Sequence, residues 1–301
     1  MKKKELKRAL ILVIAIIVVV LVIKLIQGFD TTKKDLKKLG YNKEEIEIII
    51  NTLDKDTINK VKTLEYNEYL DDIITSNYYI PNNLDRYLEY SKKESDITKV
   101  ISLVNVNADN KFYTNTTMTD SSKGYAMLVN KFHYLDANYE ASDIVSISNW
   151  YAYEGHKANK EVYEQYKKMW KDANKEELVF LVNSSFRTLE QQQKEYNSFG
   201  DDYASRPGFS EHQTGFALDI VKDGTNGNDF EDTDEFKWLS ENSYKYGFIL
   251  RYPKDKEDIT GYSYESWHYR YLGVELATKV YESKLTYDEY YAYYCEYKNE
   301  C

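Results

Sequence analysis

The hydrophobic and polar positions of the chain fall into three successive patterns, and the first is an apolar run. Residues 9–23 are uninterruptedly apolar and follow a basic N-terminus, MKKKELKR. Extended through Ile26, a helix over this run is ~27 Å long, which just spans a bilayer. Because a basic flank stays cytoplasmic, residues 1–28 are predicted to be a retained membrane anchor, with the remainder extracellular. The alternative is a cleaved signal peptide, but KLIQGFD follows the run instead of small residues.

The second pattern, over residues 29–95, predicts short amphipathic helices. In LGYNKEEIEIIINTL, Asn42 precedes Glu45 by three positions, which is the spacing of a capping box, and apolar residues then recur at helical spacing. EYLDDIITS and IPNNLDRYLEYSKK repeat that spacing. No group of residues with catalytic chemistry occurs here. We therefore interpret the segment as a helical stalk or small module, and a binding role stays open.

The third pattern begins at residue 96 and mixes helices with strands. ITKVISLVNVN and YAMLVNKFHYL are rich in β-branched residues and indicate strands or extended segments. Strands are also predicted over LVFLVNSSFR, GFALDIV, FILRY and WHYRYL, and helices over ANKEVYEQYKKMWKDANKEE, TLEQQQKEYNSF, DTDEFKWLSENSYKYG and VELATKVYESK. Regular βαβ crossovers are missing, so residues 96–285 are predicted to be an α+β domain, an antiparallel sheet with flanking helices. Residues 286–301 form a Tyr-rich tail.

Composition narrows the classes of function. The net charge is −10, whereas proteins that bind the phosphate backbone carry a basic surface, so nucleic acid is not an expected partner. The two cysteines, Cys295 and Cys301, both lie in the tail. In an exported chain they could pair with each other, but two cysteines are too few for a disulfide framework.

The segment SRPGFSEHQTGFALDI contains two possible metal ligands, His212 and Asp219, seven positions apart. In a continuous helix they would lie ~10 Å apart along the axis, and in a flat strand they would face opposite sides. A bend at Gly215 would let both reach one point. Downstream, YESWHYRYL places Glu265 three residues before His268. Two imidazoles, one carboxylate ligand and a further, unligated glutamate are the inventory of a catalytic zinc site.

Four separated segments carry a resemblance to a known family. SSFRTLEQQ, SRPGFSEHQTGFALDI, YGFILRYP and ESWHYRYLG resemble, in this order, the signature segments of the VanY-type D-alanyl-D-alanine carboxypeptidases, which are zinc peptidases that trim peptidoglycan stem peptides. The resemblance covers about residues 96–285. It implies that His212, Asp219 and His268 bind Zn²⁺ and that Glu265 is the general base.

Three further residues are candidates for contacting the substrate. Arg187 lies at the end of a predicted strand and is the candidate for stabilising the developing oxyanion and the bound peptide. Ser210 and Gln192 are candidates for holding the C-terminal residue of the peptide. The sequence does not decide which of the three contacts the terminal carboxylate.

The remaining histidines and two arginines have simpler interpretations. His133 and His156 lack carboxylate neighbours at a telling spacing, so both are expected to be structural or solvated. Arg206 and Arg251 are interpreted as salt-bridged scaffold residues rather than catalytic ones.

The leading hypothesis is a single-pass membrane protein with an extracellular zinc D,D-carboxypeptidase domain that removes the C-terminal D-alanine from stem peptides. An L,D-carboxypeptidase and a D,D-dipeptidase of the same fold remain alternatives. A wall-binding module without turnover is disfavoured because binding alone needs no base such as Glu265. A related endopeptidase is disfavoured by the retained anchor.

Overall fold

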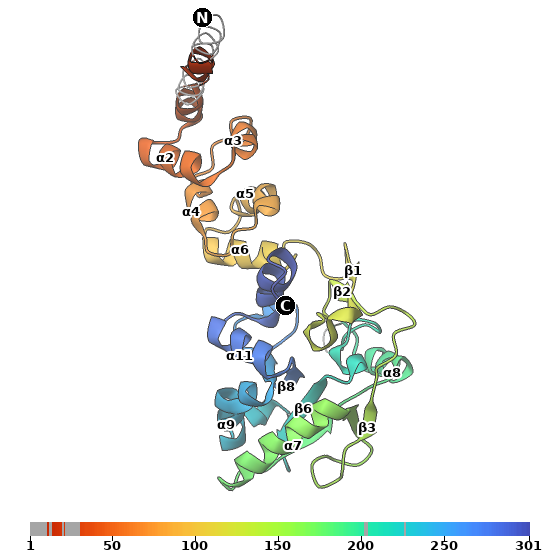
Figure 1. Ribbon diagram of the computed structural model, residues 1–301. Coiled ribbons are helices and arrows are strands. Elements are labelled where there is room, and N and C mark those ends of the chain that lie inside the picture. The colour runs from red at the N-terminus through yellow and green to blue at the C-terminus, as the bar shows by residue number, and fades with distance from the viewer. Residues whose placement is uncertain (1–10, 12–13, 20, 22–30, 202–203, 226) are drawn as a thin grey trace, which may run out of the picture. The chain divides into compact units, whose positions relative to one another are not determined.

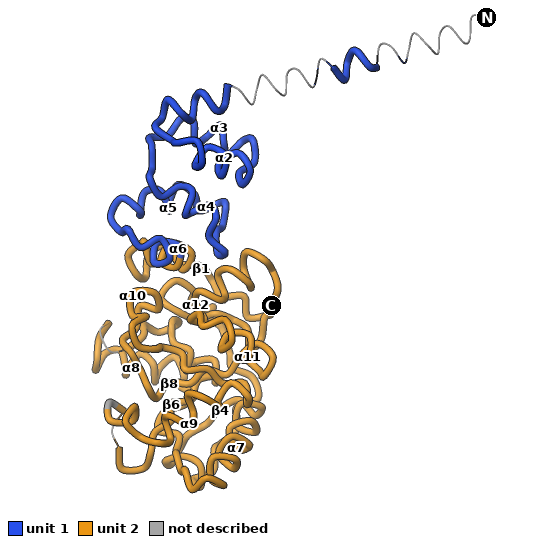
Figure 2. The backbone as a smooth tube through the Cα atoms, turned by 90° about the vertical axis from the view of Figure 1, so that its left-hand side faces the viewer, with its two compact units in different colours: residues 1–101 blue, residues 102–301 orange. Residues whose placement is uncertain are grey.

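The computed structural model describes residues 11, 14–19, 21, 31–201, 204–225 and 227–301 (Figure 1). The chain divides into two compact units, residues 1–101 and 102–301 (Figure 2). The division falls inside helix α6 (Ile97–Asn105), shortly after the predicted boundary at residue 96. Residues 286–301, which we predicted as a separate tail, belong to the second unit.

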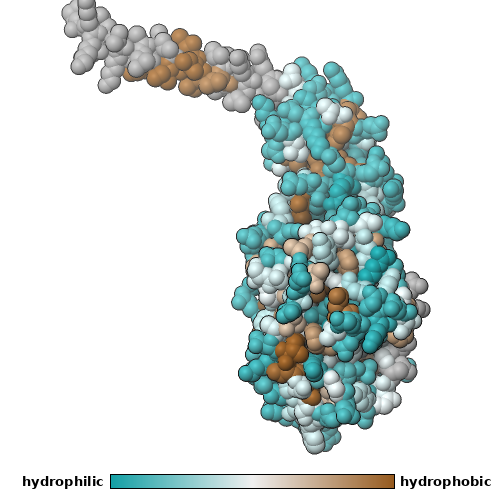
Figure 3. Space-filling model, turned by 90° about the vertical axis from the view of Figure 1, so that its right-hand side faces the viewer, coloured by the Kyte–Doolittle hydropathy of each residue, from teal (hydrophilic) through white to brown (hydrophobic). Residues whose placement is uncertain are grey.

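The predicted membrane helix lies largely outside the described residues. Its described positions are helical, and Figure 3 shows their apolar surface. The exposed apolar side chains of this segment are Ile11, Ile14, Ile16, Ile17, Val18, Val19 and Leu21. Across the described residues, no helix combines the length and the apolar character that a bilayer crossing requires.

The first unit is helical, as predicted. Its described residues include the α-helices α2 (Lys43–Thr52), α3 (Lys55–Val61), α4 (Leu70–Thr75) and α5 (Leu84–Tyr90), and residues 31–39 before them are helical as well. The capping box at the start of α2 is confirmed: the Asn42 side chain accepts from the N–H of Glu45, and the Glu45 carboxylate accepts from the N–H of Asn42 at 2.6 Å. The buried residues of the unit include Leu36, Ile46, Ile49, Leu70, Ile73, Leu84 and Tyr87.

The predicted strand over ITKVISLVNVN is wrong, because most of this segment forms helix α6. Val100, Ile101 and Val104 are all buried, and their spacing is that of one helical face. β-branched residues favour strands only weakly, and the burial of an apolar helical face outweighs that preference.

The second unit is built on a four-stranded sheet, and its predicted antiparallel arrangement is confirmed. The strands are β5 (Phe180–Ser184), β6 (Ala217–Lys222), β7 (Phe248–Tyr252) and β8 (Glu265–Tyr271). Their order is β5-β6-β8-β7, and every neighbouring pair is antiparallel. Two smaller ladders join β1 (Thr117–Met118) to β2 (His133–Tyr134) in parallel and β3 (Ile144–Ser146) to β4 (Lys157–Asn159) in antiparallel.

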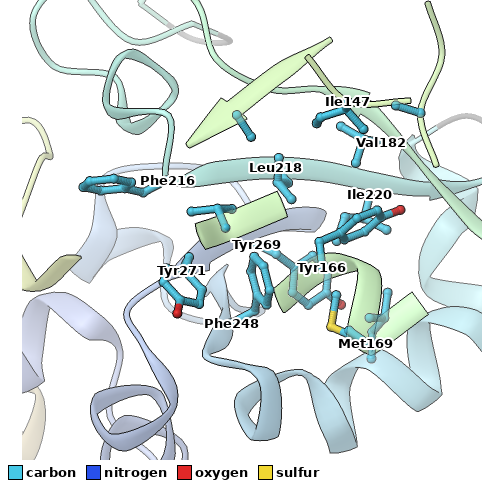
Figure 4. Packing of buried hydrophobic residues seen from close by; sticks show 14 of the residues in the cluster. Ile147, Tyr166, Met169, Val182, Phe216, Leu218, Ile220, Phe248, Tyr269 and Tyr271 are labelled. Atoms are coloured by element: carbon cyan, nitrogen blue, oxygen red, sulfur yellow. The ribbon is translucent and has the colours of Figure 1, made fainter. Parts of the chain in front are cut away.

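One side of this sheet packs against an apolar core. Helix α7 (Lys160–Asn174) contributes the predicted stripe of Val162, Tyr166 and Met169, each fully buried. Figure 4 shows Tyr166 and Met169 beside side chains of the strands. The strand residues of this cluster include Phe180, Val182, Leu218, Ile220, Phe248, Tyr269 and Tyr271.

A second apolar cluster brings the C-terminal segment into the same unit. Helix α11 (Val274–Ser283), helix α12 (Tyr287–Tyr290) and the π-helical turn η6 (Tyr291–Tyr297) follow β8. The cluster comprises Leu128, Ile249, Leu272, Ala277, Val280, Tyr287, Tyr290, Tyr291 and Cys295. Cys295 and Cys301 form a disulfide, so the pairing that the sequence left open is made.

Candidate active site

The alternation of side chains along the strands places several polar residues together. On β8, Tyr269 and Tyr271 belong to the core shared with α7, so the alternate positions 268 and 270 face the other way. His268 is therefore on the opposite side, and its partner across the ladder is Asp219 of β6. The strand register alone brings a carboxylate and an imidazole to one point.

Gly215 produces the bend that brings His212 to the same point, as predicted. A short 3₁₀ helix, η3 (Glu211–Thr214), ends at Gly215, whose φ is 76°. A Cβ atom at this position would lie 2.6 Å from Cδ1 of Ile144. Only glycine fits this left-handed conformation and close contact, and β6 with Asp219 starts directly afterwards.

His212, Asp219 and His268 form a buried cluster. One potential ligand atom from each lies within 4.8 Å of the others. The Oδ1 atom of Asp219 is 3.4 Å from Nε2 of His212 and 3.2 Å from Nδ1 of His268. The three residues that we predicted as metal ligands therefore converge.

The two imidazoles are held by opposite ring nitrogens. Nδ1 of His212 lies 2.8 Å from the carbonyl oxygen of Ser185, which can only accept a hydrogen bond, so Nδ1 carries the proton and Nε2 is left for the cluster. Nε2 of His268 lies 3.3 Å from Oε2 of Glu211, and its Nδ1 faces Asp219. Each ring thus presents one nitrogen to the common point.

The electrostatics of the two histidines differ. Burial, reinforced by the nearby Arg187, lowers the pKa of His212 to about 4. Burial also disfavours the charged form of His268, but the carboxylates of Asp219 and Glu211 outweigh it and raise the pKa of His268 to about 9. Without a metal ion, His268 therefore holds a proton between two carboxylates at neutral pH.

The cluster fits a zinc ion. Oδ1 of Asp219 is buried near both imidazoles but makes no hydrogen bond of normal geometry, and a cation would satisfy it. Two imidazole nitrogens and one carboxylate oxygen are ligands that Zn²⁺ prefers, and three protein ligands leave the fourth tetrahedral position open. Zinc is accordingly the cofactor that suits these residues.

Glu265 and Arg187 line a small cavity beside this cluster. Glu265 is the first residue of β8, and its Oε2 atom is 3.4 Å from Nδ1 of His268. Burial raises the pKa of Glu265 to about 7. The cavity has a volume of about 160 Å³ and is also lined by the three residues of the cluster. Its remaining lining residues are Glu195, Ala204, Ser205, Ser210, Glu211, Tyr252, Tyr262 and Trp267.

The other two predicted substrate contacts differ in their placement. Ser210 lines the cavity, as expected for a residue that meets the substrate. Gln192 does not: it is fully buried, its Oε1 accepts from Nε of Arg187 at 2.9 Å, and its Nε2 donates to the carbonyl of Ser205 at 2.8 Å. Both ends of its amide are thus engaged, and Gln192 orients Arg187, which also donates to Ser184 at 3.0 Å.

Glu211 is the site residue that our sequence reasoning missed. It is buried, and Oε1 accepts from both Arg251 and Arg270 at 2.8 Å. A signal was available, because two arginines inside otherwise apolar strands need buried carboxylate partners. The predicted scaffold role of Arg251 is confirmed, and Arg206 likewise forms an ion pair with Asp201.

His133 and His156 lie outside the cluster. Nδ1 of His133 is 3.1 Å from the side-chain oxygen of Asn130, and Nδ1 of His156 is 3.1 Å from the hydroxyl of Ser185. Both are partly buried, and the predicted structural role fits these contacts.

A buried His/Asp/His cluster beside a carboxylate of raised pKa and an oriented guanidinium, on a mixed α/β fold, is the arrangement of a zinc-dependent peptidase. The VanY family model, D-alanyl-D-alanine carboxypeptidase, matches residues 155–274. The chain is 39% identical over 141 residues to a D-alanyl-D-alanine carboxypeptidase of Enterococcus faecium and 34% identical over 201 residues to one of Enterococcus faecalis. It therefore belongs to the VanY family.

The extent of these matches differs. The match to the Enterococcus faecium enzyme covers 46% of this chain and 46% of the relative, so this chain spans less than half of that protein. The match to the Enterococcus faecalis enzyme covers 60% of this chain and 71% of the relative. The solved structure of the LdcB LD-carboxypeptidase is 36% identical, has a TM-score of 0.55, and is matched over 91% of its own length and 60% of this chain.

Proposed function

We propose that this protein is a membrane-anchored, extracellular zinc carboxypeptidase that removes the C-terminal D-alanine from peptidoglycan stem peptides. The observation that carries the proposal is the convergence of His212, Asp219 and His268 beside Glu265. Binding alone would not require a carboxylate whose pKa lies near neutrality next to a metal cluster, whereas proton transfer does.

The residues divide the work of peptide hydrolysis. Nε2 of His212, Nδ1 of His268 and the Asp219 carboxylate would hold zinc, which supplies Lewis acidity and lowers the pKa of a water molecule. Glu265 accepts the proton of the attacking water and passes it to the leaving amine. With a pKa of about 7, its carboxyl group can serve as base and then as acid at neutral pH.

Arg187 supplies the positive charge of the cavity. Its bonds to Gln192 and Ser184 fix the plane of the guanidinium beside the cluster. A fixed guanidinium stabilises either the oxyanion of the tetrahedral intermediate or the free carboxylate at the end of the peptide.

An amide-capped substrate tests the requirement for a free carboxylate. The full chain in detergent is incubated with a stem pentapeptide and with its C-terminal amide, and the products are identified by mass spectrometry. We expect loss of the terminal D-alanine from the pentapeptide and at least ~100-fold slower cleavage of the amide, because the partly buried guanidinium of Arg187 is left without its partner. Equal rates would instead indicate an endopeptidase.

An L,D-carboxypeptidase is the second candidate, and the similarity to the LdcB LD-carboxypeptidase favours it. Stem tetrapeptide and the dipeptide D-alanyl-D-alanine are therefore included in the same assay. Preferential cleavage of the tetrapeptide would assign the chain as an L,D-carboxypeptidase, and preferential cleavage of the dipeptide would assign it as a D,D-dipeptidase.

The membrane anchor is a separate part of the proposal, supported by the basic N-terminus and the apolar run over residues 9–23. Protease added to intact cells should remove the zinc domain and leave a short N-terminal fragment. Survival of the zinc domain until the cells are lysed would contradict the extracellular placement.

A further inference from the structure

Behind the zinc cluster lies a buried group of four charged residues. Arg251 and Arg270 are completely buried, and Glu211 and Asp288 are each 1% exposed. Two guanidiniums and two carboxylates make the group neutral overall. Burying four charges is costly unless each is paired, so the loss of any one leaves an uncompensated charge.

A continuous series of contacts connects the C-terminal segment to the zinc cluster. Asp288 accepts two hydrogen bonds from the outer nitrogens of Arg251 in a bidentate pair. Arg251 donates through Nε to Oε1 of Glu211 at 2.8 Å. Oε2 of Glu211, its other carboxylate oxygen, faces Nε2 of His268 at 3.3 Å.

Each member of this chain of contacts is fixed by a second partner. Oε1 of Glu211 also accepts from Arg270, whose Nη2 is bonded to the carbonyl of Met127 at 2.7 Å. Oδ1 of Asp288 also accepts from the amide of Asn130 at 2.7 Å. The Glu211 carboxylate therefore has a set orientation, with Oε1 held by arginines and Oε2 directed at the imidazole.

We propose that Asp288 is a positioning residue for the metal centre: through Arg251 and Glu211 it holds the His268 ring with Nδ1 toward the zinc ion. Asp288 lies in α12, outside the span 155–274 that matches the family model. The C-terminal segment then belongs to the catalytic unit in function as well as in packing. The inference rests on the zinc site of the proposed function.

Removal of the Asp288 charge should weaken zinc binding in two ways. The Arg251 guanidinium, left with one carboxylate, draws electron density from Glu211, so Glu211 becomes a weaker acceptor for His268. The group also gains a net positive charge close to the cation. Loss of a partner that orients a metal-binding histidine typically weakens metal affinity 10- to 100-fold.

The test is the zinc affinity of the full chain, measured by competition with a chromogenic chelator. Asp288→Asn should bind zinc ~10-fold more weakly than the unaltered chain, the lower end of that range, because Asp288 acts through two intermediaries. The visible absorption of the Co²⁺-substituted protein should shift in parallel, since it reports the ligand geometry.

Glu289→Gln provides a matched control. Glu289 is the next residue of α12 and is 5% exposed, but its side chain contacts Thr286, Ser102 and Lys256 instead of the charged group. Glutamine also supports the capping box with Thr286. Zinc affinity and the cobalt spectrum should therefore be unchanged in this variant.

Arg251→Lys keeps the test decisive if Asp288→Asn fails to fold. A lysine retains the positive charge but lacks the planar fork that bonds Glu211 and Asp288 together, so a similar ~10-fold loss is expected. Folding of each variant is checked by circular dichroism. Folded variants that bind zinc as tightly as the unaltered chain, with an unchanged cobalt spectrum, would overturn the inference.

The measurement also separates this inference from the proposed function. If the unaltered chain binds no zinc, both fail. If it binds zinc and the two variants bind more weakly, the positioning role stands even when no peptide is hydrolysed, and only the proposed reaction is contradicted.

Discussion

The two faces of the four-stranded sheet differ in what their side chains do. On β6, Leu218 packs into the apolar core and the next residue, Asp219, belongs to the zinc cluster. On β8, Tyr269 and His268 divide in the same way. One face stabilises the fold by burying apolar area, whereas the other face holds charges that must be paired to be tolerated. Because successive side chains of a strand point to opposite faces of the sheet, alternate positions stabilise the fold and form the site.

The largest effect is expected from Glu265 on the charged face. Glu265→Gln should lower kcat by ~10³-fold or more, because a general base and acid typically contributes 10²–10⁴. Zinc content, measured by mass spectrometry of the metal, should stay near one per chain because Glu265 is not a ligand. Glu275→Gln, an exposed member of a surface ion pair, is the control and should keep full activity. Loss of zinc from Glu265→Gln would make Glu265 a ligand instead.

A substitution on the apolar face should instead lower the stability of the fold and leave the zinc site intact. Leu218→Ala is expected to lower the free energy of unfolding by ~2–5 kcal/mol, the range for a buried leucine, and to leave zinc affinity unchanged below the unfolding transition. Urea denaturation of the full chain measures the first effect and chelator competition the second. Leu189→Ala, at a position 47% exposed, should cost less than ~0.5 kcal/mol. A large change in zinc affinity for Leu218→Ala would show that the two faces are not independent.

An intermediate effect is expected from Gln192, which lies behind the cavity. Gln192→Ala frees the Arg187 guanidinium and should lower kcat/KM by ~30-fold, less than the 10²–10³ typical for removing an oxyanion donor itself. Zinc content should be normal. Gln192→Glu should retain part of the activity, because its carboxylate still accepts from Arg187 although it cannot donate to the carbonyl of Ser205. A direct contact with substrate would instead make both variants equally defective.

Regular elements and ligand identities were predictable because their signals are local. FILRY was predicted as a strand and is β7 to the residue, and the stripe of α7 follows from helical spacing. The ligands His212 and Asp219 come from one short segment whose bend is marked by Gly215. In α6 two local signals disagreed: the β-branched composition indicated a strand and the spacing of the apolar residues indicated a helix. The composition was the weaker signal.

The parts that escaped prediction depend on contacts far apart in the sequence. Glu211 stands next to His212, yet its partners Arg251 and Arg270 are 40 and 59 residues away. Gln192 was assigned to the substrate because nothing in its segment indicates that its amide would be used by Arg187 and the carbonyl of Ser205. Pairing of buried polar groups is a property of the folded chain, so motif spacing does not reveal it.

The smallest effect concerns the proton that His268, on the charged face, holds in the absence of zinc. The pKa of His268 is raised to about 9, above its ordinary value of 6.5, whereas His212, with a pKa of about 4, is already neutral at pH 8. Zinc needs the lone pair on Nδ1 of His268, so binding at pH 8 should release about one proton. Zinc affinity should accordingly fall about tenfold per pH unit as the pH decreases from 9 to 7.

Calorimetric titrations in two buffers of different ionisation enthalpy measure this proton release. Glu265→Gln is a useful comparison, because Glu265 also titrates, with a pKa of about 7, and its removal leaves His268 as the group that responds at pH 8, although loss of the nearby carboxylate also lowers the pKa of His268. The raised pKa of His268 also determines how the stability of the metal-free fold depends on pH. The raised pKa of His268 stabilises the metal-free fold below the unfolded value of about 6.5, and this contribution is lost as the pH rises through about 9. Zinc binding without proton release at pH 8 would mean that His268 is neutral beforehand, and the two carboxylates on this face would then need a different counter-charge.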